Sequence, residues 1–88
     1  MCAHREYKAA DAELNKVYGR LAGVLDEEDK ASLKESELAW IKYRDSTCVF
    51  ESSQYKGGTM RGMIESFCLT RVTKSRTAEL KDQYELRR

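Results

Sequence analysis

The segment WIKYRDSTC at residues 40–48 decides how this chain folds. It places an indole (Trp40), a guanidinium (Arg44) and a thiol (Cys48) at successive four-residue steps, so in a helix all three lie on one face. A glycine pair and then a second thiol, Cys68, follow along the chain. This order predicts two antiparallel helices that a Cys48–Cys68 disulfide joins across their connection.

The small size of the chain makes such a crosslink useful. Its 88 residues predict a single domain over residues 1–88, and cores of this size often need an added constraint. Closing the loop between Cys48 and Cys68 removes entropy from the unfolded chain and stabilises the fold by roughly 3 kcal/mol. Cys2 is then left over, and its alternatives are a partner upstream, an intermolecular disulfide, a free thiol or lipidation.

The charge balance argues against a nucleic-acid partner. Lysine and arginine number 16 and acidic residues 15, so the net charge of +1 creates no strong overall field. Basic residues at 61, 71, 74 and 76 form a local strip without the aromatic residues that base stacking needs. No apolar run approaches the roughly 20 residues that span a bilayer, so we expect no transmembrane segment.

Apolar residues that recur every three or four positions predict three amphipathic helices. The first spans residues 4–25, and we expect its glycines at positions 19 and 23 to let another helix approach closely. The second begins at the acidic cluster 26–29, which supplies a cap, and runs to about residue 52. Its inward face carries Glu37 besides the residues of the opening motif.

The third helix follows a loop over residues 52–59, in which Gly57 and Gly58 tolerate positive φ. Thr59 is expected to cap this helix, and the charged tail from Leu80 onward is expected to fray. This helix, imperfectly amphipathic toward its carboxyl end, is marked by Met60, Met63, Ile64, Phe67, Cys68, Arg71, Val72, Lys74, Ala78, Leu80 and Tyr84. The fold class is therefore all-α, either a small three-helix bundle or an extended helical hairpin.

Two ordered blocks, Asp-x-x-Leu-Asn-x-x-Tyr at 11–18 and Trp-x-x-Tyr-Arg-x-x-x-Cys at 40–48, carry a family resemblance. Together with the later glycine pair and second cysteine they resemble the LprI-like family of small bacterial envelope proteins, over roughly residues 2–80. The residues that carry this resemblance, besides the cysteines, are Asp11, Leu14, Asn15, Tyr18, Trp40, Tyr43, Arg44, Gly57, Gly58, Arg76 and Leu80.

The resemblance implies a cysteine-bearing helical domain in the periplasm or secreted, and one family member is reported to inhibit lysozyme. A signal peptide and a further upstream cysteine, common in the family, are not present in this sequence. The implied function is that of a noncatalytic envelope protein that inhibits lysozyme by occluding its cleft. The alternative is a structural or interaction module with another envelope partner.

No residue pattern indicates catalysis, a metal site or a cofactor. Cys2 and His4 are too few for a structural zinc site. A catalytic thiol needs a nearby base, and the sole histidine lies near the amino end. Glu35 and Glu37 are two residues apart on a helix and point in different directions.

Trp40, Arg44 and Asp45 have two interpretations. Exposed tryptophan and arginine are typical interface anchors, so the three could form a recognition patch. The interpretation we favour is that Trp40 fills the core while Arg44 lies across it and pairs with Asp11 or Glu37. Asp11 and Asn15 lie one turn apart, where they either form a polar pocket with Arg44 or satisfy buried polar groups.

An inhibitor of lysozyme must occlude a cleft whose working groups are two carboxylates. The connection between the second and third helices offers donors for those carboxylates, namely Tyr55, Lys56, Thr59 and Arg61. The acidic cluster 26–29 is a rival docking edge for a basic enzyme surface. Because acids are ordinary at a helix start, we favour the connection.

Overall fold

The computed structural model describes residues 2–55 and 57–88, with side chains from residue 4 onward. Helix α1 spans Cys2–Ala22, α2 spans Glu27–Ser52 and α3 spans Met60–Arg87, with a short 3-10 turn, η1, at Ser53–Tyr55. The prediction of an all-α fold with three helices is confirmed.

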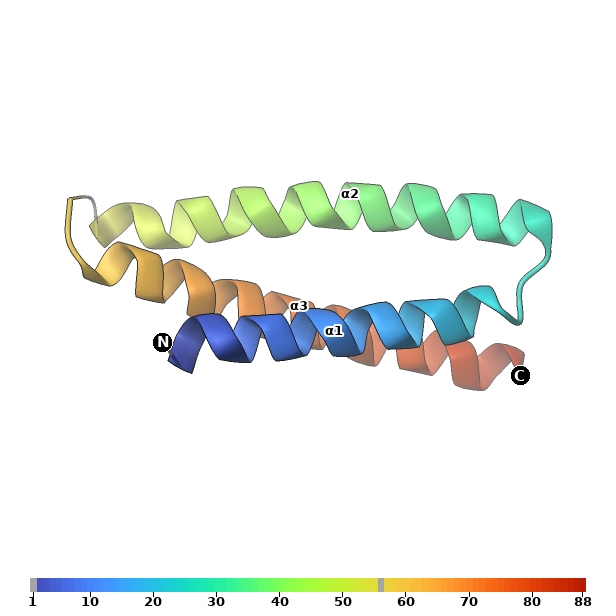
Figure 1. Ribbon diagram of the computed structural model, residues 1–88. Coiled ribbons are helices and arrows are strands. Elements are labelled where there is room, and N and C mark those ends of the chain that lie inside the picture. The colour runs from blue at the N-terminus through green and yellow to red at the C-terminus, as the bar shows by residue number, and fades with distance from the viewer. Residues whose placement is uncertain (1, 56) are drawn as a thin grey trace.

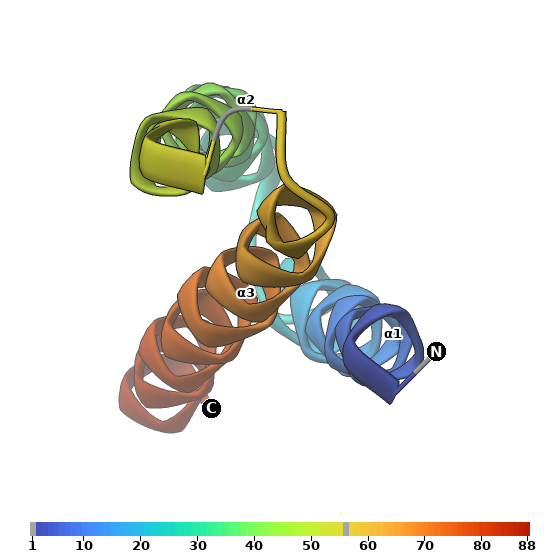
Figure 2. The same cartoon turned by 90° about the vertical axis from the view of Figure 1, so that its left-hand side faces the viewer.

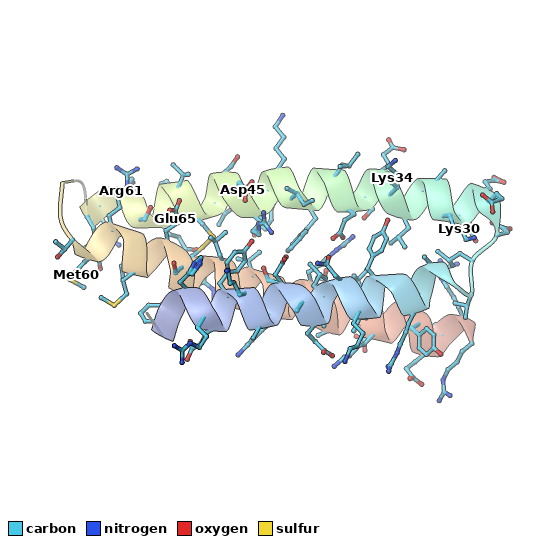
Figure 3. The ribbon with its side chains drawn as sticks, viewed as in Figure 1. Lys30, Lys34, Asp45, Met60, Arg61 and Glu65 are labelled. Atoms are coloured by element: carbon cyan, nitrogen blue, oxygen red, sulfur yellow. A yellow bond between two sulfur atoms is a disulfide. The ribbon has the colours of Figure 1, made fainter. Side chains whose placement is uncertain are left out.

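The helices form an elongated rod of 47 × 22 × 15 Å. α1 and α3 run in the same direction, and α2 returns antiparallel to both (Figure 1). The view along the rod shows α3 between the other two helices (Figure 2), and α3 packs against both while α1 and α2 make little direct contact. α3 is therefore the central helix of an open bundle, and charged residues such as Lys34 point away from it on the outer side of α2 (Figure 3).

The hydrophobic core lies along the seam between α1 and α3. Its buried members are Leu14, Val17, Leu21 and Leu80, and the partly buried Tyr18, Leu25, Leu33, Trp40 and Tyr84 pack against them. On α1 the inward residues are Tyr7, Ala10, Leu14, Val17 and Leu21, and on α3 they are Thr70, Thr73, Thr77, Leu80 and Tyr84. Both series alternate steps of three and four, which is the spacing of parallel coiled-coil packing.

Threonines, not methionines, form the inward face of the first half of this α3 seam. Met60, Met63 and Phe67, which mark the periodicity of this helix in the sequence, are 47%, 40% and 46% exposed. The sequence pattern did not identify this seam because threonine was not counted among the residues that face inward. Threonine hydroxyls can be satisfied within their own helix, as Thr77 shows by donating to the carbonyl of Thr73 at 3.0 Å.

Several local expectations also differ from the structure. α1 ends at Ala22 instead of Leu25. A Cβ at Gly19 would meet nothing within 4 Å, and one at Gly23 would meet only carbonyl oxygens of the preceding turn, so no helix approaches there. The end of α3 does not fray, because Leu80 is buried and the helix continues to Arg87.

The helix starts behave differently from one another. Asp26 caps α2 as predicted, since its carboxylate accepts a hydrogen bond from the N–H of Asp29 at 2.8 Å. Thr59 precedes α3 but makes no side-chain capping bond, because its backbone is already helical. Gly57 has a φ of 74°, which is the positive value the glycine pair predicted.

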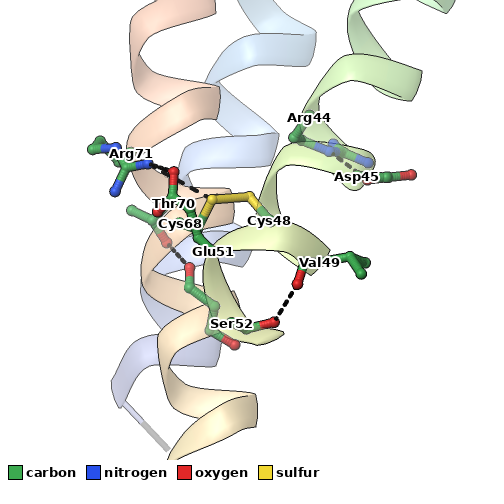
Figure 4. Close-up of a disulfide and its surroundings, with 10 residues drawn as sticks. Arg44, Asp45, Cys48, Val49, Glu51, Ser52, Cys68, Thr70 and Arg71 are labelled. Carbon is green, nitrogen blue, oxygen red and sulfur yellow. Dashed lines mark hydrogen bonds and ion pairs between the residues drawn. A yellow bond between two sulfur atoms is a disulfide. The ribbon is translucent and has the colours of Figure 1, made fainter. Parts of the chain in front are cut away.

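The predicted disulfide between Cys48 and Cys68 is present, and it joins the end of α2 to the first half of α3 (Figure 4). Both cysteines are buried and their Cα atoms lie 5.5 Å apart. Arg71 reinforces this junction, because its guanidinium donates to the Glu51 carboxylate and, at 3.7 Å, to the sulfur of Cys68. The crosslink thus fixes α2 to α3 beside their connection.

Replacing both bridging cysteines (Cys48→Ala with Cys68→Ala) should lower the free energy of unfolding by about 3 kcal/mol, because the unfolded chain regains the entropy of an open loop. Urea unfolding followed by circular dichroism measures this loss. Cys2→Ser is the control and should leave the midpoint unchanged in monomeric protein. A loss below about 1 kcal/mol in the double variant would contradict a stabilising role of the bond.

Candidate functional site

A stack of aromatic rings and guanidinium groups connects all three helices at the middle of the rod. The guanidinium carbon of Arg44 on α2 lies 5.2 Å from the ring centroid of Trp40 and 5.8 Å from that of Tyr7 on α1. Arg76 on α3 lies 5.8 Å from the Trp40 centroid. Cations at these distances from aromatic faces are attracted by the ring electrons. The indole therefore lies within cation–π distance of two arginines, one on α2 and one on α3.

Ion pairs fix both arginines of this stack. Arg76 donates from Nε to Glu37 at 3.1 Å and from Nη2 to Ser36 Oγ at 3.1 Å, and its side chain and that of Glu37 are only 12% and 13% exposed. Arg44 donates to Asp45 at 2.9 Å. The prediction that Arg44 pairs with Asp11 or Glu37 was therefore wrong. Glu37 pairs with Arg76 of α3, and Arg44 pairs with Asp45.

The other motif residues take varied positions. Asn15 is exposed, Asp11 is half-buried and neither side chain makes a hydrogen bond among the described residues, so they do not form a polar pocket with Arg44. Tyr43 is 60% exposed. Trp40 packs against the core and is covered by the arginines, which favours packing over exposed recognition.

The planar guanidinium group of Arg76, which donates to Glu37 and Ser36 together, should be essential to the stability of this stack. Arg76→Lys should lower the free energy of unfolding by about 1–2 kcal/mol, because an ammonium cannot bind Glu37 and Ser36 together while lying over the indole. Arg87→Lys is the matched control, since Arg87 makes a half-exposed pair with Asp29, and should cost at most about 0.5 kcal/mol. Equal losses in urea unfolding would contradict the special role of Arg76.

Tyr7 is the residue of this stack with a shifted pKa. Burial raises the pKa of its phenol above the ordinary 10.0, the positive charge of Arg44 opposes the shift, and the charges of Asp11 and Asp45 add to it. Burial has this effect because it disfavours the charged phenolate. The structure therefore holds Tyr7 neutral to a higher pH than the unfolded chain does.

This difference predicts a loss of stability at alkaline pH. As the pH rises above about 10, the unfolded chain releases the Tyr7 proton before the folded chain, so the free energy of unfolding falls. Tyr7→Phe should make this fall shallower, and below pH 10 the two proteins should respond to pH alike. Urea unfolding between pH 8 and pH 11 tests the prediction, with Tyr43→Phe, which removes an exposed phenol, as the control. Parallel curves for Tyr7→Phe and the unmodified chain would contradict it.

The connection between α2 and α3 forms one tip of the rod (Figure 1). Tyr55 is half-buried, Thr59 and Arg61 are exposed, and Lys56 lies outside the described residues. The Gly58 N–H donates to the carbonyl of Tyr55 at 3.1 Å, and the Arg61 N–H donates to that of Gly58 at 3.3 Å. Among the described residues the guanidinium of Arg61 makes no ion pair, and Glu65 one turn further along α3 is the acid next to it on the helix.

The rival acidic cluster at 26–29 has local roles that explain its composition. Asp26 caps α2, Glu27 pairs with Lys30 at 3.4 Å and Asp29 pairs with Arg87 at 3.3 Å. These contacts hold the start of α2 and attach it to the end of α3. The acids are thus those of an ordinary helix start.

A groove of about 420 Å³ lies where α1, α2 and α3 meet near the other tip, with a leucine floor and both Arg76 and Arg87 at its edge. Both arginines are already paired with acids, so neither offers a free charge to a ligand. Over residues 2–55 and 57–88 no group of three or more histidine, cysteine or acidic side chains is placed to hold a metal ion. None of the helices described is long and apolar enough to cross a membrane.

Comparison with known proteins places the chain in a family. The family described as "Lysozyme inhibitor LprI" matches residues 1–80. An uncharacterised protein of Rhizobium meliloti (strain 1021) is 39% identical over 98 aligned residues, which cover 97% of this chain and 70% of the relative. No solved structure matches the chain. The chain belongs to the LprI family, which is named for inhibition of an enzyme.

Proposed function

We propose that this member of the LprI family is a noncatalytic protein of the periplasm or the secreted fraction that binds lysozyme and occludes its cleft. Family membership over residues 1–80 supports the target. The buried disulfide supports the location, because such bonds persist in oxidising compartments.

The observation that carries the inhibitory surface is the unpaired positive charge at the α2–α3 tip. A glycosidase cleft of this kind works with two carboxylates, and a guanidinium can donate two parallel hydrogen bonds to a carboxylate. Arg61 is exposed at the start of α3 and makes no ion pair among the described residues. Tyr55, Lys56 and Thr59 are the further donors that we assign to the same contact.

The shape and rigidity of the tip support insertion into a cleft. The rod is only 22 × 15 Å across its two shorter dimensions, so one tip can enter where a globular protein of equal mass cannot. The disulfide and the Arg71–Glu51 contact hold the two flanking helices together close to the tip. Flanking helices that are already fixed lose little conformational entropy on binding, which favours affinity.

Removing the tip cations tests this proposal. The double variant Lys56→Ala with Arg61→Ala should inhibit a c-type lysozyme about 10- to 100-fold less well, because charge-assisted hydrogen bonds to the catalytic carboxylates are lost. A cell-wall lysis assay with titrated, oxidised inhibitor measures the change.

Arg20→Ala is the matched control, since Arg20 is an exposed arginine in the last turn of α1 at the opposite tip. It should inhibit like the unmodified chain. Equal inhibition by all three proteins would place the inhibitory surface elsewhere. No inhibition by excess unmodified protein would reject this lysozyme as target and favour an interaction module for another envelope partner.

A further inference from the structure

The end of the rod at the α2–α3 connection extends past the start of α1. Helices α1 and α3 run parallel, and the ion pair of Glu13 with Lys81 at 3.7 Å shows which of their residues lie level with each other. Cys2 precedes Glu13 by eleven positions, so it lies level with about Thr70 of α3. Residues 60–69 of α3 therefore lie beyond α1 (Figure 1), and α2 is the one described helix beside them.

This end of the rod, which we call the tip hairpin (residues 48–55 and 57–68), has almost no buried apolar side chains. Between its two cysteines, Ser52 is the one buried residue among those described. The large hydrophobic side chains that it exposes are Val49, Phe50, Met60, Met63 and Phe67. The hydrophobic core lies on α1 and α3 further along the rod. A segment with so few buried apolar contacts opens locally at a low free energy.

Two links join α2 to α3 at the tip hairpin. The first is the disulfide between Cys48 and Cys68, both of which are buried. The second is the ion pair of Arg71 with Glu51, in which the arginine side chain is 60% exposed. An ion pair as exposed as this one contributes little to stability. Among the described residues, the disulfide is therefore the principal link between the two helices at this end.

We propose that the Cys48–Cys68 disulfide is a redox switch that orders the tip hairpin. When the bond is formed, the end of α2 and the first turns of α3 are held as a helical hairpin. When both thiols are reduced, this segment opens while the α1–α3 core remains folded. The opening is confined to the tip hairpin because the core cluster and the Arg76–Glu37 pair both lie outside it.

A dithiol is the class of reductant that operates this switch. Its thiolate attacks Cys48 Sγ, the S–S bond breaks, and Cys68 leaves as a thiolate that then takes up a proton. The second thiol of the reductant closes the reductant's own disulfide and releases Cys48, so two electrons and two protons pass to the chain. Cys68 is the leaving sulfur because the guanidinium of Arg71 lies 3.7 Å from it and stabilises a thiolate. Because both cysteines are buried, exchange proceeds when the tip hairpin opens.

The switch also regulates inhibition, and this part of the inference rests on the proposed function. Arg61, which we assign to the lysozyme contact, lies within the tip hairpin. The oxidised chain presents its side chain from an ordered helix. The reduced chain must first order this segment, which costs conformational entropy on binding. The order of the tip hairpin itself does not depend on lysozyme.

Hydrogen exchange on the full chain tests the switch, with dithiothreitol as the reductant. In the oxidised chain the amides of residues 49–52 and 64–67 should exchange at least about 100-fold more slowly than in an unstructured peptide. Reduction should bring these amides to within about tenfold of the unstructured rate. Amides of residues 14–21 and 77–84 should stay at least about 100-fold slower, because the core remains packed.

The double variant Cys48→Ala with Cys68→Ala should exchange like the reduced chain, with or without dithiothreitol. Cys2→Ser is the matched control and should behave like the unmodified chain in both states. Tip amides that keep their protection after reduction would overturn the proposal, since the helices would then hold without the bond. Loss of protection along the whole rod would also overturn it, because the disulfide would then stabilise the entire fold.

A cell-wall lysis assay separates this inference from the proposed function. The double alanine variant needs no reductant, and it should inhibit lysozyme about tenfold less well than the oxidised chain. A variant whose tip amides have lost protection but which inhibits like the unmodified chain would overturn the inhibitory tip and its regulation. The hydrogen exchange result would still establish the switch.

Discussion

The position of α2 depends on polar and covalent links, because most of the hydrophobic core belongs to α1 and α3. All four buried residues of the core cluster lie on those two helices, whereas the buried residues of α2 are Cys48 and Ser52. The disulfide attaches one end of α2 to α3, and the Arg76 stack attaches its middle. A partly buried arginine bound to a carboxylate, a hydroxyl and an indole thus replaces the apolar contacts that a larger bundle would use.

The same arrangement explains why a family motif can combine tryptophan, arginine and cysteine on one helix face. Trp40, Arg44 and Cys48 are three successive contacts of α2 along the rod, made with α3, α1 and α3 respectively. The first two are contacts between a guanidinium and an aromatic ring and the third is a disulfide, and together they define the register between the helices.

Much of this fold could be predicted from the sequence because its signals are local. The spacing of apolar residues in α1, the Asp26 cap and the separation of Cys48 from Cys68 are each read within one element or one connection. The pairing of Glu37 with Arg76 could not be predicted, because 39 residues separate them and only the register of α2 on α3 brings them together. The threonine seam was missed because hydropathy places threonine outside, although its three-and-four spacing with Leu80 carries the signal.

Because the core of this open bundle is thin, its central helix α3 is not covered on all sides. α3 already buries one face on α1 and another on α2, yet its first two turns still present methionines and Phe67 to solvent. Solvation of such a surface is unfavourable, so it persists only where something covers it or where binding needs it. Glu13 and Lys81 pair across the α1–α3 groove at 3.7 Å, so opposite charges on its two edges join α1 to α3 within the chain. The elongated shape follows from three helices that pack together only through α3, which leaves the apolar residues at the start of α3 exposed beside the tip.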